Sequence, residues 1–129
     1  MIKKATPVLI VDRIEPLLPL WDALGFARAA EVPAGDALGF VILVRDGVEL
    51  MYQTFDSIRG DEPKALEGSP AIGASAVYIE VEDLDAIAAQ IPSGTDVIVA
   101  RRQTFYGSNE TIFRDAAGTL ITFAQFAAP

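Results

Sequence analysis

The sequence predicts an α+β protein built from two tandem βαβββ modules, each a strand, a helix and then further strands. Two internal matches indicate the repeat. The stretch VLIVDRIEPL at 8–17 corresponds to YIEVEDLDAI at 78–87, and VILVRDGVELMYQT at 41–54 corresponds to ETIFRDAAGTLITFAQ at 110–125. Both matches occur in the same order at an offset of about 70 residues, which favours one unit used twice.

The first module is expected over about residues 5–55. Its first strand, at 5–11, leads into a helix over about 12–24, with Gly25 as the C-terminal cap. Because Pro19 cannot donate a backbone hydrogen bond, we expect this helix to start irregularly. PAGD and RDG turns separate the strands that follow, which are expected at about 27–33, 38–45 and 48–55.

The second module is expected over about residues 75–126, after a linker. Residues 56–74 have the Gly, Pro and charge content of such a linker. The second module is predicted to contain a strand at 75–81, a helix at about 84–91, and strands at about 96–103, 110–114 and 119–126. The chain is short enough for the two modules to form one domain over residues 1–129.

The two faces of the predicted strands differ in composition. Alternate side chains of a strand point to opposite sides of the sheet. One face is uniformly apolar, includes Tyr52 and Phe123, and should receive the two helices. The other face mixes polar and apolar groups, which suits the lining of a cavity. The residues expected on this mixed face are Glu49, Met51, Gln53, Ala76, Tyr78, Glu80, Leu120, Thr122 and Ala124.

Composition excludes several classes of chemistry and partner. The chain has no cysteine and no histidine, so it lacks thiolates, the usual base at neutral pH and the commonest metal ligand. A net charge of −8 argues against binding nucleic acid or an anionic membrane surface. No apolar run approaches the ~20 residues that span a bilayer. The N-terminal stretch lacks a signal-peptide pattern, so we expect a cytoplasmic protein.

Two longer stretches resemble a known family. TPVLIVDRIEPLLPLWDALGF at 6–26 is similar to the first strand and helix of the vicinal oxygen chelate superfamily, which includes glyoxalase I, extradiol dioxygenases and the fosfomycin and bleomycin resistance proteins. YGSNETIFRDAAGTLITF at 106–123 is similar to the family's closing hairpin, with Ala116 in place of a proline. The resemblance implies a cupped mixed sheet with the helices on its convex side.

The resemblance also implies where a metal would be held. The family's ligand positions fall near Thr6, Glu49, Ala76 and Thr122. Only Glu49 binds a divalent cation well, because alanine cannot coordinate and threonine hydroxyls are weak ligands. We therefore expect no metal and no cofactor. The alternative is a weak two-carboxylate site for Mg²⁺ or Ca²⁺ formed by Glu49 and Glu80.

Glu49 interrupts an apolar strand, so its environment is the main question that the sequence raises. An ionised carboxylate is rarely buried without a partner. Glu49 is expected to be solvated, to pair with Arg101 or Arg102, to remain as the remnant of a metal site, or to contact a cationic ligand. The sequence leaves these alternatives open.

The resemblance is greatest to the bleomycin resistance branch, whose members lack the metal ligands. It implies a metal-free homodimer that binds a small molecule, such as a cationic or aromatic antibiotic. Aromatic side chains can hold cations or planar ligands, so the pocket candidates Tyr78, Phe105 and Tyr106 agree with such a ligand. The expected ligand-binding residues are Glu49, Met51, Gln53, Tyr78, Glu80, Phe105, Tyr106 and Thr122.

Two other functions stay open. The first is a superfamily enzyme, a lyase, isomerase or dioxygenase acting on a small oxygenated substrate, with Glu49, Glu80 or Tyr78 as acid or base. Three non-ligating residues among the four implied metal positions disfavour this function. The second is a structural or regulatory protein without a ligand.

Overall fold

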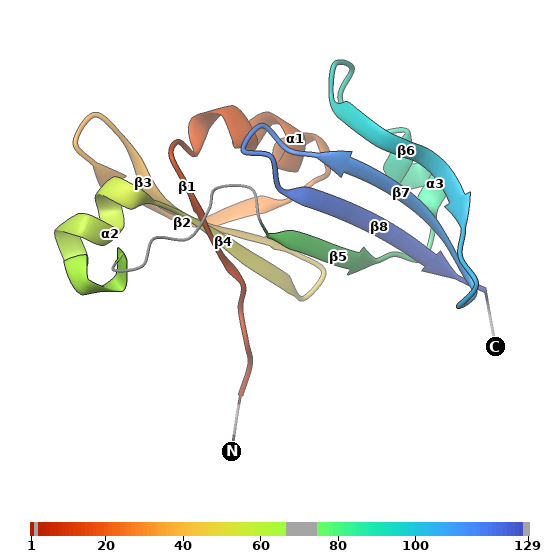
Figure 1. Ribbon diagram of the computed structural model, residues 1–129, viewed down its shortest axis with the longest axis horizontal. Coiled ribbons are helices and arrows are strands. Elements are labelled where there is room, and N and C mark those ends of the chain that lie inside the picture. Colours follow the sequence, from red (N-terminus) through yellow and green to blue (C-terminus); the bar gives the residue numbers. More distant parts are fainter. Residues whose placement is uncertain (2, 67–74, 128–129) are drawn as a thin grey trace. The chain divides into compact units, whose positions relative to one another are not determined.

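The strands of the protein form two four-stranded mixed sheets, ordered β1-β4-β3-β2 and β5-β8-β7-β6. The structure, a computed structural model, describes residues 1, 3–66 and 75–127 (Figure 1). In each sheet the first strand runs parallel to the last strand of its module, and the remaining neighbours are antiparallel. The chain divides into two compact units, residues 1–72 and 73–129, with one sheet in each. The predicted α+β fold with two βαβββ modules is confirmed.

The first unit follows the predicted order, with an added helix at its end. Its elements are β1 (Val8–Val11), the 3-10 turn η1 (Glu15–Leu17), α1 (Leu18–Ala23), β2 (Ala27–Ala34), β3 (Ala37–Arg45), β4 (Val48–Thr54), α2 (Phe55–Asp61) and the 3-10 turn η2 (Pro63–Leu66). The irregular start expected from Pro19 is the turn η1, which leads directly into α1. Gly25 has a φ of 79°, and the Phe26 amide donates to the Trp21 carbonyl at 2.9 Å, as in a glycine helix cap.

Helix α2 lies where the sequence predicted only a linker. Thr54 caps it, because its hydroxyl accepts a hydrogen bond from the Ser57 amide at 3.1 Å. The helix packs on β3 and β4. Gly39 of β3 permits this approach, since a Cβ there would lie 2.7 Å from the Ala34 Cβ and 3.0 Å from the Ser57 Cβ. Residues 67–74 of the predicted linker lie outside the described residues.

The core of the first unit is built around Trp21 of α1. Its indole Nε1 donates to the Tyr52 hydroxyl at 3.0 Å, so the polar end of each buried aromatic side chain has a partner. The Phe26 ring packs edge-on against Trp21, with ring centroids 4.8 Å apart. Leu50 and Tyr52 are buried on one face of β4, while Glu49, Met51 and Gln53 are half-buried on the other. The predicted alternation of β4 is confirmed.

The second unit repeats this pattern with a shorter helix. Its elements are β5 (Ala76–Glu80), α3 (Leu84–Ala88), β6 (Asp96–Gln103), β7 (Ser108–Arg114) and β8 (Leu120–Phe126). Helix α3 packs against β7 and β8, and Figure 1 shows it on one side of this sheet. It ends before the predicted residue 91 because Pro92 disfavours a helical conformation of the residue before it. Among the described residues, no helix has the length and apolar character needed to cross a membrane.

The core of the second unit lies under α3 on the apolar face. The Phe113 and Phe123 rings pack there with centroids 5.7 Å apart, beside buried Ile121 and Leu84. The closing turn is held by Asp115, whose Oδ1 accepts from the Ala117 and Thr119 amides, both at 2.9 Å. Because α3 covers the apolar face of this sheet, polar groups can lie on the opposite face.

Candidate functional site

A fully buried carboxylate, Glu110, lies at the centre of the mixed face of the second sheet. Glu110 belongs to β7, and the strand register places it opposite Arg102 of β6 on one side and Ala124 of β8 on the other. Its side chain is 0% exposed, although the neighbouring Arg102 and Tyr78 side chains are about half exposed. An anion in this position needs strong compensation, because burial removes its hydration.

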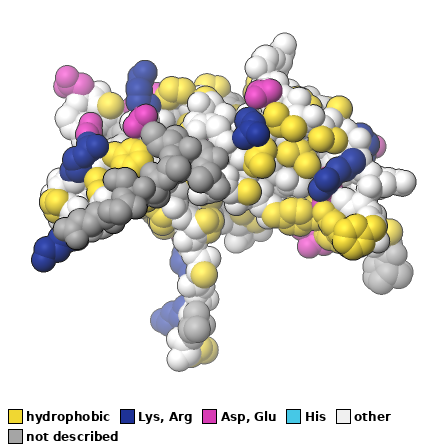
Figure 2. Space-filling view, viewed as in Figure 1, with side chains coloured by type: hydrophobic (Ala, Val, Ile, Leu, Met, Phe, Trp, Pro, Cys, Tyr) yellow, Lys and Arg dark blue, Asp and Glu magenta, His cyan; other side chains and the backbone are white. Residues whose placement is uncertain are grey.

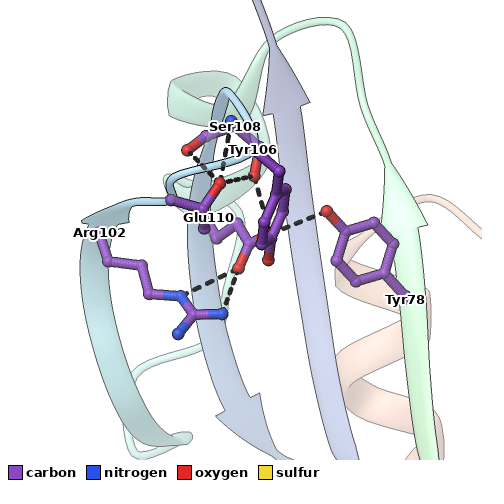
Figure 3. Close-up of polar contacts among 6 residues, drawn as sticks. Tyr78, Arg102, Tyr106, Ser108 and Glu110 are labelled. Carbon is purple, nitrogen blue, oxygen red and sulfur yellow. Dashed lines mark hydrogen bonds and ion pairs between the residues drawn. The ribbon is translucent and has the colours of Figure 1, made fainter.

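Five hydrogen bonds provide that compensation, and Figure 3 shows them converging on the carboxylate. The hydroxyls of Tyr78, Tyr106 and Ser108 each donate to Oε2 at 2.8 Å. Arg102 donates to Oε1 through Nε at 3.0 Å and Nη2 at 2.7 Å. We call Glu110 with these four partners the Glu110 cluster.

Small residues and a tight turn bring these side chains together. Tyr78 lies on β5, two strands away from Glu110, and the strand between them carries Ala124 beside Glu110. Adjacent strands are about 4.8 Å apart, so two long side chains can meet across the sheet above a methyl group. Tyr106 lies in the β6–β7 turn, where Gly107 has a φ of 92° and the Ser108 amide donates to the Thr104 hydroxyl at 3.1 Å.

The cluster fixes the charge of its members at neutral pH. Burial by itself would raise the pKa of Glu110, but hydrogen bonds from Arg102, Tyr106, Tyr78 and Ser108 outweigh it and lower the pKa to about 2. Burial and the hydrogen bond to Glu110 raise the pKa of Tyr78. The site thus holds a permanent carboxylate and a neutral phenol, and neither has a pKa suited to general base catalysis near neutral pH.

Exposed aromatic rings lie beside Tyr106 of the cluster. The Phe105 side chain is fully exposed, and its ring lies edge-on to Tyr106 with centroids 5.1 Å apart. The Phe126 ring lies 6.4 Å from the Tyr106 ring. Figure 2 shows hydrophobic side chains gathered over the second unit, next to Lys or Arg and Asp or Glu side chains. Such ring faces bind planar or cationic groups.

Within the second unit, the structure brings together several of the predicted ligand-binding residues. Tyr78 and Tyr106 meet at Glu110, with Phe105 beside them. Thr122 pairs with Tyr78 in the strand register, and Glu80 lies two residues further along β5 on the same face. Glu49, Met51 and Gln53 belong to the first unit instead; the Gln53 amide donates to the Ser57 hydroxyl at 3.2 Å.

Glu49 has a partner that the sequence analysis did not predict. Lys4 Nζ lies 3.0 Å from both carboxylate oxygens, and the Thr6 hydroxyl donates to Oε1 at 3.0 Å. These bonds, that from Lys4 first, lower the pKa of Glu49. Of the alternatives left open for Glu49, pairing with Arg101 or Arg102 is not the one found: Arg101 pairs with Asp85, and Arg102 with Glu110.

The residues at the family's metal positions do not fit a divalent metal. In the first unit, the ammonium of Lys4 and the hydroxyl of Thr6 already bind Glu49. In the second unit, the buried pair Ile79–Phe123 corresponds to Leu9–Tyr52, which makes Leu120 rather than Thr122 the counterpart of Glu49. Within the described ranges, no three Asp, Glu, His or Cys side chains gather into a possible metal site.

Sequence reasoning missed Glu110, and it considered Arg102 only as a possible partner of Glu49. The signal was present, because Glu110 interrupts the strand SNETIFR as Glu49 interrupts VELMYQT. Glu110 lies three residues before the core residue Phe113, so their side chains point to opposite faces and Glu110 belongs to the mixed face. The preceding strand, β6, carries Arg102. The sequence does not reveal the register between β6 and β7, which sets Arg102 opposite Glu110.

The two βαβββ units share their fold with solved bleomycin-binding and glyoxalase/bleomycin resistance proteins, so the predicted resemblance is confirmed at the level of the fold. One is a bleomycin-binding protein complexed with bleomycin (TM-score 0.66, 20% identity, covering 98% of this chain and 100% of that one). Another is TnmS3, an antibiotic binding protein from Streptomyces sp. CB03234 (TM-score 0.65, 17% identity, 98% and 99%). A third is a glyoxalase/bleomycin resistance protein/dioxygenase from Nocardioides (TM-score 0.69, 15% identity, 98% and 86%).

This chain resembles these proteins in structure. Neither the comparison with family models nor that with curated proteins gives a match. At identities of 20% or less, the solved structures establish the fold of this chain. Its function has to be argued from its own site.

Proposed function

We propose that this protein binds a small organic molecule, cationic or aromatic, on the mixed face of its second sheet. The observation that carries the proposal is the Glu110 cluster, in which a buried carboxylate holds two half-exposed tyrosines in place. Binding sites for small molecules combine aromatic walls with a few well-positioned polar groups. Solved proteins of the same fold include one complexed with bleomycin and one that binds an antibiotic.

Charge supports a cationic ligand. The chain carries a net charge of −8, which raises the local concentration of cations near its surface. Tyr78, Phe105 and Tyr106 are exposed residues, and aromatic rings are suited to cation–π contact or stacking. An antibiotic such as a cationic glycopeptide combines both properties.

We propose further that the protein is a homodimer in the cytoplasm. It sequesters its ligand without a metal ion and without converting the ligand chemically. The side chains at the family's metal positions support the absence of a metal site, because the only carboxylate there is engaged by Lys4. The lowered pKa of Glu110 and the raised pKa of Tyr78 support binding over acid–base catalysis at the cluster.

Isothermal titration calorimetry with bleomycin and with 9-aminoacridine, a planar aromatic cation, tests this function. We expect saturable binding of at least one compound, and recovery of the compound unchanged by mass spectrometry. Phe105→Ala should weaken the binding, since it removes a fully exposed ring without touching the core. Val32→Ala, a half-exposed apolar residue of the first sheet, is the matched control and should have no effect.

Four results would contradict parts of the proposal. Absence of binding by both compounds would remove the function itself. Equal effects of Phe105→Ala and Val32→Ala would place the site elsewhere. Chemical conversion of a bound compound would replace sequestration by catalysis, and sedimentation of the protein as a monomer with and without ligand would remove the homodimer.

A further inference from the structure

We infer that the Glu110 cluster selects ligands that donate hydrogen bonds from a cationic nitrogen, such as protonated primary or secondary amines, over quaternary ammonium ions and anions. The inference rests on the proposed function and names the ligand class of that same site. It follows from the direction of the hydrogen bonds in the cluster.

The direction of these bonds is fixed by the carboxylate. An ionised carboxylate only accepts hydrogen bonds, and a tyrosine hydroxyl has a single proton to donate. The hydroxyls of Tyr78 and Tyr106 both use that proton to donate a hydrogen bond to Oε2 of Glu110. Neither hydroxyl therefore has a proton left for a ligand, and each phenol oxygen can offer a ligand only its lone pairs.

Donation to an anion also strengthens what the phenols offer. Charge-assisted hydrogen bonds are strong, and bonds in a chain polarise one another. A phenol that donates to a carboxylate carries more electron density on its oxygen and its ring. Tyr78 thus becomes both a better acceptor for an N–H group and a better ring face for a cation.

The charges around the cluster direct a cation to the Tyr78 side. Arg102 lies on β6, where its guanidinium is neutralised by Glu110 and also neighbours Tyr106. Tyr78 lies on β5, on the opposite side of Glu110, and Figure 3 shows it away from Arg102. Glu80 is exposed on the same face of β5, two residues from Tyr78, and adds a negative charge there.

Anions and neutral acceptors are disfavoured at Tyr78, because Arg102, the cation of the cluster, donates to Glu110 and not toward β5. On the β5 side the polar groups are the phenol oxygen of Tyr78 and the carboxylate of Glu80, both acceptors, and the Thr122 hydroxyl, which can donate one hydrogen bond. A ligand carboxylate would be repelled by the charge of Glu80, and a ligand carbonyl would find, among the described residues, only the Thr122 hydroxyl as a donor on this side.

Three probes of similar size separate the possible interactions: 2-phenylethylammonium, trimethyl(2-phenylethyl)ammonium and phenylacetate. All carry one phenyl ring, the first two share a positive charge, and only the first has N–H donors. Titrations followed by amide chemical shifts should give a Kd at least about tenfold lower for 2-phenylethylammonium than for its trimethyl analogue, with phenylacetate weakest. Equal or tighter binding of the trimethyl ion would overturn the inference.

Variants test the same point without changing the probe. Tyr78→Phe keeps the ring but removes the acceptor oxygen, so the preference for the N–H cation should fall to about one while the trimethyl ion still binds. Glu80→Gln removes only charge and should weaken both cations by a similar factor. Retention of the full preference in Tyr78→Phe would contradict the role of the phenol oxygen.

Failure of this inference differs from failure of the proposed function. If the inference alone is wrong, the two cations bind alike at the cluster and 9-aminoacridine still binds. If the proposed function is wrong, none of the three probes and neither larger compound shifts the amides of the second sheet.

Discussion

Arg102 and Glu110 face each other across β6 and β7, and the guanidinium donates to one carboxylate oxygen from both Nε, at 3.0 Å, and Nη2, at 2.7 Å. The other oxygen accepts three hydroxyl groups. A single buried side chain therefore orders residues from β5, β6, β7 and the turn before β7. Stability and ligand binding should both depend on it.

Replacing Glu110 with Gln should lower the free energy of unfolding by about 2–3 kcal/mol, because an amide cannot accept all five hydrogen bonds and leaves polar groups unsatisfied. Urea denaturation followed by circular dichroism measures the change. Glu80→Gln, at an exposed position on the same face, is the control and should cost less than about 0.5 kcal/mol. Similar losses in both variants would mean that the cluster does not contribute as described.

Acid should weaken the wild-type protein in a defined range of pH through Glu110. The folded-state pKa of about 2 lies below the ordinary value of 4.5, so the unfolded chain binds the proton more tightly. The contribution of Glu110 is complete above about pH 4.5 and is lost as the pH falls toward about 2. The difference in unfolding free energy between wild type and Glu110→Gln should therefore shrink across this range. A difference independent of pH would contradict the assigned pKa.

Tyr52→Phe should destabilise the first unit by about 1–2 kcal/mol, because the buried Trp21 indole loses its acceptor. Trp21 is the sole tryptophan of the chain, so its fluorescence follows the change directly. We expect the emission of the folded variant to shift to shorter wavelength, since the indole loses a polar partner. Unchanged stability and emission would show that the indole finds another acceptor.

Gly39→Ala should cost about 1–3 kcal/mol, because the new methyl group would lie 2.7 Å from the Ala34 Cβ and force β3 and its neighbours apart. Gly60→Ala is the matched control. Gly60 lies in α2 with nothing within 4 Å of an added Cβ, and alanine there should stabilise by about 0.5–1 kcal/mol. Thermal unfolding of the two variants should move in opposite directions.

The repeat and the alternation of side chains predicted most of the fold. Leu50, Tyr52 and Phe123 are buried on the faces where their parity placed them, and Gly25 caps α1. Helix α2 was missed because its Gly, Ser and Asp content matches that of a linker. Its stability comes from the Thr54 cap and from packing on β3 and β4, which composition does not reveal.

The site was less predictable because it depends on register. Parity placed Tyr78 on the correct face, and the loop position marked Tyr106, but neither indicates a shared acceptor. The partners of Glu49 and Glu110 are set by which residues stand opposite on neighbouring strands. Arg102, which the sequence offered as one possible partner of Glu49, binds Glu110, and Lys4 binds Glu49.

The central claim is that the mixed face of the second sheet binds small cationic or aromatic molecules. Mapping the amide chemical shifts of ¹⁵N-labelled protein during titration with 9-aminoacridine tests it most directly. We predict saturable shifts that are largest at Tyr78, Tyr106 and Glu110. Absence of saturable shifts, or saturable shifts confined to β2 and β3 of the first unit, would contradict the claim.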